Sequence, residues 1–226
     1  MGYLRSLAFY LAFYGGTVLY VLAALVMIAL RSSALLPVVT GWSRFHRACV
    51  TGLLGIRVKV EGELPSGAVL VAMKHESFFE AIDMPCLLHA PAIFAKAELL
   101  RIPMWGKVAR TYGLVAVERD QGAKALRAML SAAKRATSAG RLLAIFPEGT
   151  RVPHDTEPPL QSGFAGLYKL VGLPVVPIAI DSGPLYHRRW KRRGTITYRV
   201  GEAVPPGLSR EEAEARVHGA INALKA

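Results

Sequence analysis

Residues 142–151 read Leu-Leu-Ala-Ile-Phe-Pro-Glu-Gly-Thr-Arg, an apolar run followed directly by a turn that carries charged side chains. A short apolar run of this kind is typical of a buried strand in a parallel sheet, and ligands of open α/β sheets bind where such strands end. Glycine lets the backbone approach a ligand closely, and arginine presents a planar fork that matches phosphate oxygens. Gly149, Thr150 and Arg151 are therefore predicted to contact an anionic ligand. The alternative is an ordinary turn with a solvated arginine.

A second strand-like run, residues 68–73, is followed by Lys-His-Glu-Ser-Phe-Phe-Glu. Ser77 and Glu80 have the spacing of a capping box, which predicts that a helix begins at Ser77. His75 then lies in the loop before the helix. Because helical side chains point back toward the N-terminus, Glu80 is expected to reach one ring nitrogen of His75. That contact would fix the tautomer and leave the other nitrogen as a general base.

Simpler interpretations of these two residues remain open: Glu80 as a cap alone, and His75 as a solvated loop histidine. A zinc site of the H-E-x-x-H type is excluded because position 79 is Phe. The sequence has no Walker loop, no dinucleotide glycine fingerprint and no G-x-S-x-G elbow. We therefore expect neither a metal nor a bound cofactor.

Strand-like runs alternate with helical patterns along the rest of the chain, which indicates an α/β fold. Helices are predicted over residues 121–139, 162–171 and 209–224, and a late strand over 195–200. A bend at residues 55–67 is expected to act as a linker between an N-terminal segment and the α/β domain.

The composition points to a membrane and to anionic partners. Among 226 residues, 28 Lys and Arg outnumber 16 Asp and Glu, giving a net charge of +12, and 52% are hydrophobic. Such a charge favours phospholipid headgroups or phosphorylated substrates. The two cysteines, Cys49 and Cys86, form no disulfide framework and fit a reducing compartment.

Residues 6–30 are uncharged and mostly apolar. About 20 such residues span a bilayer core, whereas the apolar region of a signal peptide is roughly 7–15 residues long. We therefore predict membrane-anchoring helices within residues 1–56 and a globular α/β domain over residues 57–226.

Arginines predict the orientation of this anchor. Arg31, Arg44 and Arg47 follow the apolar segment, whereas only Arg5 precedes it. The positive-inside bias then places the domain in the cytoplasm, at the inner membrane. Residues 41–56 are expected to form a second helix, either at the membrane interface or packed on the domain. A full span and a re-entrant hairpin both remain open.

Together, these motifs resemble the glycerolipid acyltransferase family, and they are most similar to its bacterial lysophosphatidic acid acyltransferases. The family carries four ordered blocks, and each has a counterpart between about residues 57 and 205. The counterparts are His75-x4-Glu80, residues 113–119 (Gly-Leu-Val-Ala-Val-Glu-Arg), residues 146–151, and residues 173–178 with two prolines. The chain departs from the family pattern at Glu80, where Asp is usual, and at Lys74, where Asn is common.

The resemblance implies a mixed sheet flanked by helices, behind an N-terminal helical membrane anchor. It implies transfer of an acyl chain from coenzyme A or acyl carrier protein to the sn-2 hydroxyl of 1-acylglycerol-3-phosphate, which gives phosphatidic acid for phospholipid synthesis. His75 would be the base and Glu80 its partner. The implied substrate-binding residues are Arg119, Arg151, Gly149, Thr150, Lys96 and Glu148, the last organising its loop through an arginine.

Two other functions remain open. The same chemistry on another lyso-lipid, such as a lyso-aminolipid, would need no phosphate on the acceptor. A non-catalytic membrane-bound adaptor would use only its basic surface. The densest basic run, residues 187–193, is expected to form a loop that contacts anionic membrane lipid or an acidic carrier protein, rather than nucleic acid.

Overall fold

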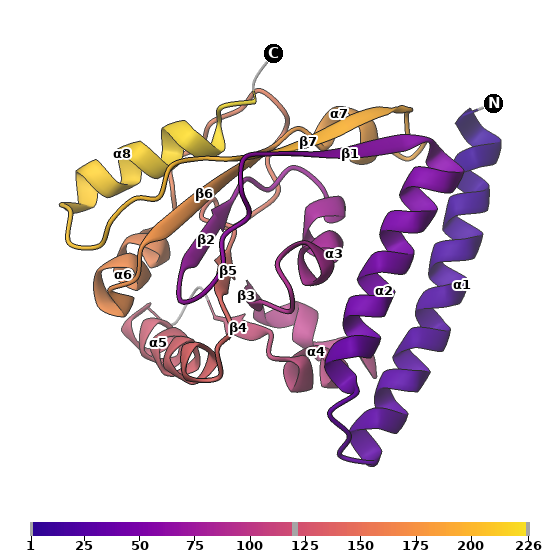
Figure 1. Ribbon diagram of the computed structural model, residues 1–226, viewed down its shortest axis with the longest axis horizontal. Coiled ribbons are helices and arrows are strands. Elements are labelled where there is room, and N and C mark those ends of the chain that lie inside the picture. The colour runs from indigo at the N-terminus through magenta and orange to yellow at the C-terminus, as the bar shows by residue number, and fades with distance from the viewer. Residues whose placement is uncertain (1, 119–121, 225–226) are drawn as a thin grey trace.

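The computed structural model describes residues 2–118 and 122–224, and it folds as a single twisted sheet with helices on both faces (Figure 1). The strands are β1 (Ile56–Glu61), β2 (Leu70–Met73), β3 (Ala92–Lys96), β4 (Val115–Val117), β5 (Leu143–Ile145), β6 (Val175–Ile180) and β7 (Gly194–Val200). The helices are α1 (Gly2–Ala29), α2 (Leu35–Cys49), α3 (Phe78–Leu87), α4 (Trp105–Tyr112), α5 (Gly122–Ser138), α6 (Ser162–Val171), α7 (Gly183–Tyr186) and α8 (Arg210–Ile221). A π-helix, Val50–Leu54, extends α2, and a 3-10 helix, Ala97–Arg101, follows β3.

The strand order is β1-β7-β6-β2-β5-β3-β4, and β6 and β7 form the antiparallel pair in an otherwise parallel set of named strands. The prediction of a mixed α/β sheet with a helical N-terminal segment is therefore confirmed. Because β2 lies at the centre, the loops that follow β2, β5 and β6 meet at one edge of the sheet. Ligands bind at this kind of edge in open α/β folds.

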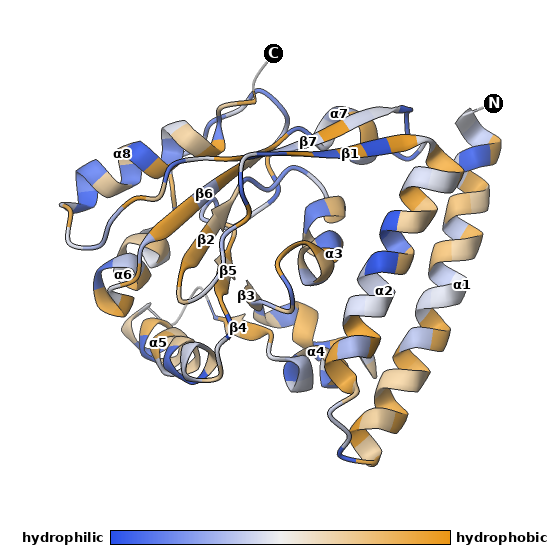
Figure 2. Ribbon diagram, in the orientation of Figure 1, coloured by the Kyte–Doolittle hydropathy of each residue, from blue (hydrophilic) through white to orange (hydrophobic). Residues whose placement is uncertain are grey.

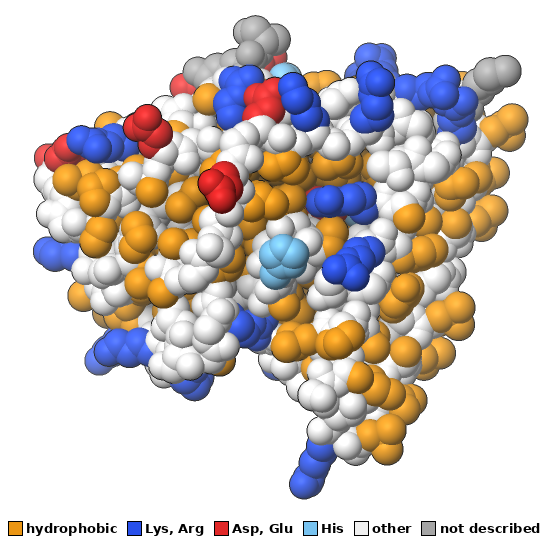
Figure 3. All heavy atoms as spheres, in the orientation of Figure 1, with side chains coloured by type: hydrophobic (Ala, Val, Ile, Leu, Met, Phe, Trp, Pro, Cys, Tyr) orange, Lys and Arg blue, Asp and Glu red, His pale blue; other side chains and the backbone are white. Residues whose placement is uncertain are grey.

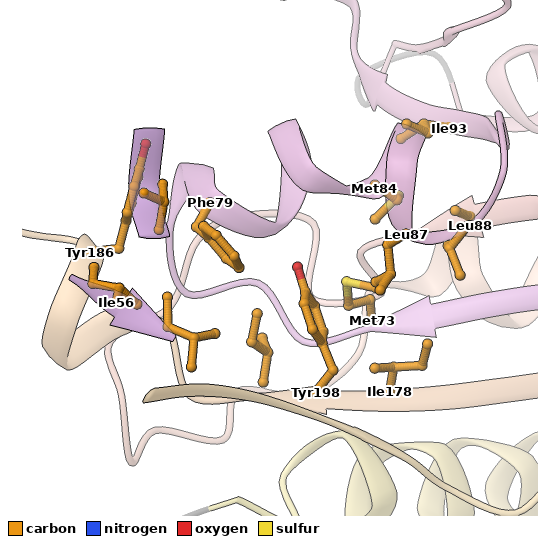
Figure 4. Packing of buried hydrophobic residues seen from close by; sticks show 14 of the residues in the cluster. Ile56, Met73, Phe79, Met84, Leu87, Leu88, Ile93, Ile178, Tyr186 and Tyr198 are labelled. Atoms are coloured by element: carbon orange, nitrogen blue, oxygen red, sulfur yellow. The ribbon is translucent and has the colours of Figure 1, made fainter. Parts of the chain in front are cut away.

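Alternation along the central strand builds a core on each side of the sheet. In β2, Val71 and Met73 join a cluster with α1 and α3, whereas Leu70 and Ala72 join a cluster with α5, α6 and α8. All four side chains are buried, as expected for a parallel strand covered on both faces. Figure 2 shows the apolar central strands, and Figure 4 shows the first cluster from close by.

The structure corrects one expectation about the chain. Residues Ile56–Glu61, predicted as the start of a linker, form edge strand β1, which pairs in parallel with β7 from Ile56 opposite Gly194 onward. The sequence alternates Ile, Val and Val with Arg, Lys and Glu, which is a half-buried strand pattern with charges on the exposed face. Gly55 and Gly62 flank this segment, and flanking glycines are also typical of a linker, which is why the strand was not predicted.

Helix α1 has two apolar faces with different surroundings. Phe9 and Phe13 are buried in the same core as β2, whereas the outer face exposes a row of large apolar side chains (Figure 3). These are Leu4, Leu7, Leu11, Val18, Leu19, Leu22 and Val26. With 28 residues, α1 is long and apolar enough to cross a membrane.

Helix α2 packs on the domain, which was one of the two arrangements expected for the second helix. The Ser43 hydroxyl donates to the carbonyl of Ile82 at 2.7 Å. The Arg47 guanidinium pairs with the buried carboxylate of Asp83, with 2.7 Å between Nε and Oδ1. Polar contacts thus fix α2 between α1 and α3, as Figure 1 shows.

Candidate active site

The parallel pairing of β2 and β5 brings the two main motifs together. Ala72 lies opposite Ile145, and His75 and Glu148 each follow three residues later at the same edge. The His75 amide donates to Oε2 of Glu148 at 3.2 Å, and the Val152 amide donates to the His75 carbonyl at 2.8 Å. The two motifs are therefore one hydrogen-bonded unit.

The imidazole of His75 is held on two sides. Its Nδ1 donates to Oε1 of Glu80 at 2.9 Å, and its ring stacks on Phe146 with 3.9 Å between centroids. Within the described residues, Nε2 has no hydrogen-bond partner, and His75 lines a large cavity. This arrangement leaves one ring nitrogen of a cavity-lining histidine without a protein partner.

Glu80 is fully buried and accepts from four donors besides His75. The amides of Glu76 and Ser77 donate to Oε1 at 2.7 and 2.6 Å. The hydroxyls of Ser77 and Ser182 donate to Oε2 at 3.0 and 2.7 Å. Burial alone would raise the pKa of Glu80, but the hydrogen bonds and the attraction of His75 hold it below its ordinary value of 4.5. Glu80 is thus both the helix cap and the partner of His75.

Behind the histidine, Lys74 and Glu148 form a buried ion pair, with 2.6 Å between Nζ and Oε1. The same ammonium donates at 2.7 Å to the carbonyl of Thr156 and to Oδ1 of Asn222. Glu148 is therefore absent from the cavity lining, and its partner is a lysine rather than the expected arginine. Its carboxylate instead joins the turn after β5 to Lys74 and to the His75 amide.

A second carboxylate braces the loop that follows Arg151. Glu76 is 3% exposed; its Oε1 lies 2.8 Å from Nδ1 of His154, and its Oε2 accepts from the Gly183 amide at 2.7 Å. Burial raises the pKa of Glu76, against the opposing hydrogen bonds from Gly183 and His154. Glu76 thus joins the loop after β5 to the start of α7, which follows Ser182.

The cavity beside His75 has a volume of about 1190 Å³ and is walled mainly by apolar side chains from α1, α2, α4 and the loop before α4. These include Phe13, Val21, Val39, Ile102, Val108 and Tyr112. The space suits one or more extended apolar chains, since ligand pockets for small molecules are usually 300–1,000 Å³. Helix α1 is therefore one wall of the cavity as well as a candidate membrane span.

The predicted anion-binding residues gather at this cavity. Gly149 lies in the lining with φ of 72°, a left-handed conformation that glycine adopts without strain. Thr150 and Arg151 are exposed in the same lining, and the Arg151 guanidinium lies 4.0 Å above the Phe78 ring. Lys96 also lines the cavity, with its ammonium 3.3 Å from Glu98. The predicted residue Arg119 lies outside the described residues.

Several groups at the site were not foreseen from the sequence. Ser182 bonds Glu80 and Asn222 bonds Lys74, each across more than 100 residues of sequence. Local spacing in the sequence therefore could not predict either contact. His154 offered a weak signal, as the one histidine soon after the turn. Within residues 2–118 and 122–224, no group of three or more His, Cys, Asp or Glu is placed to hold a metal ion.

Comparison with known proteins identifies the family of this chain. A family model described as Acyltransferase matches residues 55–181. The 1-acyl-sn-glycerol-3-phosphate acyltransferase of Pseudomonas aeruginosa is 30% identical over 210 residues, covering 89% of this chain and 80% of that protein. The human lysophospholipid acyltransferase LPCAT4 is 31% identical over 180 residues, covering 72% of this chain and 33% of that protein.

Among solved structures, the 1-acyl-sn-glycerophosphate acyltransferase PlsC of Thermotoga maritima superimposes with a TM-score of 0.76 at 25% identity. The match covers 99% of this chain and 95% of that one. The chain belongs to the acyltransferase family. It is an O-acyltransferase, so the interpretation as a non-catalytic adaptor is set aside.

Proposed function

We propose that this O-acyltransferase moves an acyl chain from a thioester, carried by coenzyme A or by acyl carrier protein, to the sn-2 hydroxyl of 1-acylglycerol-3-phosphate. The observation that carries the proposal is the His75–Glu80 pair, which opens onto an apolar cavity next to Arg151. The names of the relatives support the acceptor.

In the proposed mechanism, Nε2 of His75 takes the proton of the acceptor hydroxyl. The hydroxyl oxygen forms a bond to the thioester carbonyl carbon, the carbon–sulfur bond breaks, and the proton passes from Nε2 to the departing sulfur. Glu80 keeps the proton on Nδ1 and stabilises the imidazolium that forms between the two transfers. General-base catalysis of this kind contributes roughly 10²–10⁴ in rate.

The acceptor's phosphate would lie against Arg151 and Lys96, with Gly149 and Thr150 beside it. Arginine suits this role because its planar fork matches phosphate oxygens. Arg119, which follows Glu118 in the lining, stays a proposed second arginine. Glu148 is proposed as a positioning group that acts through Lys74 and the His75 backbone.

Membrane attachment would deliver the acceptor and receive the product. The exposed apolar face of α1 fits lipid, and the arginines that follow α1 favour an inner membrane with the catalytic domain in the cytoplasm. Arg189, Arg192 and Arg193 are exposed in a loop whose Arg189 carbonyl accepts a hydrogen bond from Tyr10 of α1. Lys and Arg side chains gather near the N-terminal end of the chain in Figure 3. The three arginines would contact anionic lipid headgroups at the surface.

The test is acyl transfer by the full chain in lipid nanodiscs, offering lysophosphatidic acid with each donor in turn. Wild type should form phosphatidic acid, and His75→Ala should lower kcat by about 10²–10⁴ while keeping its thermal unfolding midpoint. Equal turnover by His75→Ala would falsify the role of His75. Transfer only to a lyso-lipid that lacks phosphate would replace the proposed acceptor.

A further inference from the structure

The loop of residues 187–193 is held against the first turns of α1 by hydrogen bonds and an aromatic contact. The Tyr10 hydroxyl donates to the Arg189 carbonyl at 2.6 Å, and the Lys191 amide donates to the Ser6 hydroxyl at 2.9 Å. Tyr3 packs edge-on against Trp190 with 4.8 Å between ring centroids. These contacts fix the loop's geometry, so its side chains are presented in defined directions.

Lys191 differs from the arginines of this loop in its burial. Lys191 is part-buried and lines the large cavity, unlike its exposed neighbours Arg192 and Arg193. Its ammonium lies 3.7 Å from the centroid of the Tyr186 ring and donates to the Tyr186 carbonyl at 2.8 Å. A weaker contact of 3.4 Å reaches the carbonyl of Arg188. Neutral carbonyls and aromatic rings thus surround a positive charge.

No carboxylate among the described residues pairs with Lys191 or with Arg188, which also lines the cavity. Burial lowers the pKa of Lys191 to about 8, as expected for an ammonium without a counter-ion. A cation taken out of water is costly unless an anion compensates it. The missing partner is therefore expected to be a ligand.

Lys191 and Arg188 form one cationic corner of the cavity, and Arg151 forms another. Arg151 lies over the ring of Phe78, whereas Lys191 lies over Tyr186, whose ring packs 5.6 Å from Phe79. Phe78 is half-exposed and lines the cavity, whereas Phe79 is buried in the core, so the two cations lie against different sides of the start of α3. The proposed reaction brings two anionic molecules to one cavity, and each corner can hold one of them.

We propose that Lys191 and Arg188 form a second phosphate-binding subsite, distinct from the Arg151 corner. Its ligand is a phosphate ester, from either the pantetheine-linked donor or a bilayer headgroup. The identity of the donor rests on the proposed function, whereas the binding of a phosphate ester does not. Lysine binds phosphate as a point charge, and charge-assisted hydrogen bonds are about twice as strong as neutral ones.

The experiment uses the full chain in zwitterionic nanodiscs and measures coenzyme A binding by titration calorimetry, with no turnover needed. Lys191→Met keeps the aliphatic stem on Tyr186, Lys191→Arg keeps the charge, and Arg188→Gln tests the exposed partner. Lys134→Met, on the exposed face of α5, is the matched control. Thermal unfolding midpoints show that each variant folds.

Lys191→Met and Arg188→Gln should each weaken coenzyme A binding about tenfold, with Lys191→Arg within threefold of wild type and Lys134→Met unchanged. If coenzyme A binding is unaffected but association with phosphatidylglycerol vesicles falls in the same two variants, the subsite takes a lipid phosphate. Unchanged binding of both probes by both variants overturns the proposal.

Kinetics separate this inference from the proposed function. With lysophosphatidic acid as acceptor, the donor KM should rise in Lys191→Met while the acceptor KM stays within twofold of wild type. Absence of transfer by wild type, with coenzyme A binding still sensitive to Lys191, would remove the proposed acceptor and keep the subsite. If both variants show normal kinetics and normal binding while wild type transfers the acyl chain, the proposed function is kept and the subsite is rejected.

Discussion

Lys74 and His75 are consecutive, yet both are tied to one carboxylate: the Lys74 ammonium lies 2.6 Å from Oε1 of Glu148, and the His75 amide donates to Oε2 of the same residue at 3.2 Å. The ion pair therefore sets the backbone position of the proposed base relative to the turn that carries Arg151. Both charges have lost their hydration, so each is stabilised mainly by the other, and removing one leaves an uncompensated buried charge.

Removing one member of that pair should expose this dependence. Lys74→Met leaves the Glu148 carboxylate buried without its cation, so we expect the free energy of unfolding to fall by about 3–5 kcal/mol, measured by denaturant titration. The double variant Lys74→Met/Glu148→Gln should recover part of this loss. Equal stability of the single and double variants would contradict the assignment of the loss to the unpaired Glu148 carboxylate.

Glu80→Gln should reduce both turnover and stability. In wild type, both carboxylate oxygens accept hydrogen bonds, and in the variant an NH₂ group replaces one of them and faces those donors. The neutral amide also no longer stabilises a charged His75. We expect kcat to fall at least tenfold and the unfolding free energy to fall by about 1–3 kcal/mol. Glu80→Asp, the residue usual in the family, is the matched control and should keep more activity than Glu80→Gln.

Stability should depend on pH through the same carboxylate. Because the folded pKa of Glu80 is held below 4.5, its contribution is fully present above pH 4.5 and is lost as pH falls through the folded pKa. Wild type should therefore lose more unfolding free energy than Glu80→Gln on acidification below pH 4.5. Parallel acid-unfolding curves for the two proteins would contradict the assigned shift.

Arg151→Ala should mainly weaken binding of the acceptor. The guanidinium is exposed at the cavity and rests on Phe78, so its removal costs the fold little. We expect the KM for lysophosphatidic acid to rise about tenfold or more, with kcat within a few-fold. Arg151→Lys should rescue only in part, because a lysine lacks the bidentate fork. A fall in kcat alone, at constant KM, would argue against phosphate binding by Arg151.

Glu76→Gln tests the brace behind the Arg151 loop. Loss of the charge weakens the bond to His154 and the bond from the Gly183 amide, so the loop should be held less firmly. We expect the acceptor KM to rise several-fold, with a smaller change in kcat. Glu63→Gln, an exposed carboxylate, should behave as wild type. An unchanged KM in Glu76→Gln would confine this residue to folding.

Local patterns predicted the parts of the site that depend on neighbours in the chain. Ser77 and Glu80 lie three residues apart, so their spacing alone announced the helix start, and the structure shows the expected contact between Glu80 and His75. The turn after β5 was equally visible from its apolar run and its glycine. The roles of these residues in catalysis stay predictions.

Long-range partners could not be predicted in the same way. Asn222 reaches Lys74 from the end of α8, across 148 positions, because α8 packs on the neighbouring strands β6 and β2. The partner of Glu148 was expected to be an arginine and is Lys74, since charge type alone does not specify which cation the fold places nearby. Strand β1 was missed because an edge strand pairs on one side only, and its glycine brackets resemble a linker.

Phe9 and Phe13 lie in the same core as the central strand, while α1 also walls the cavity. The predicted boundary at residue 56 therefore cuts through packed side chains. Removing the first helix to obtain a soluble protein would therefore open one side of the cavity and expose core side chains to water. If the proposed function holds, substitutions on the inner face of this helix would change which acyl chains the enzyme accepts.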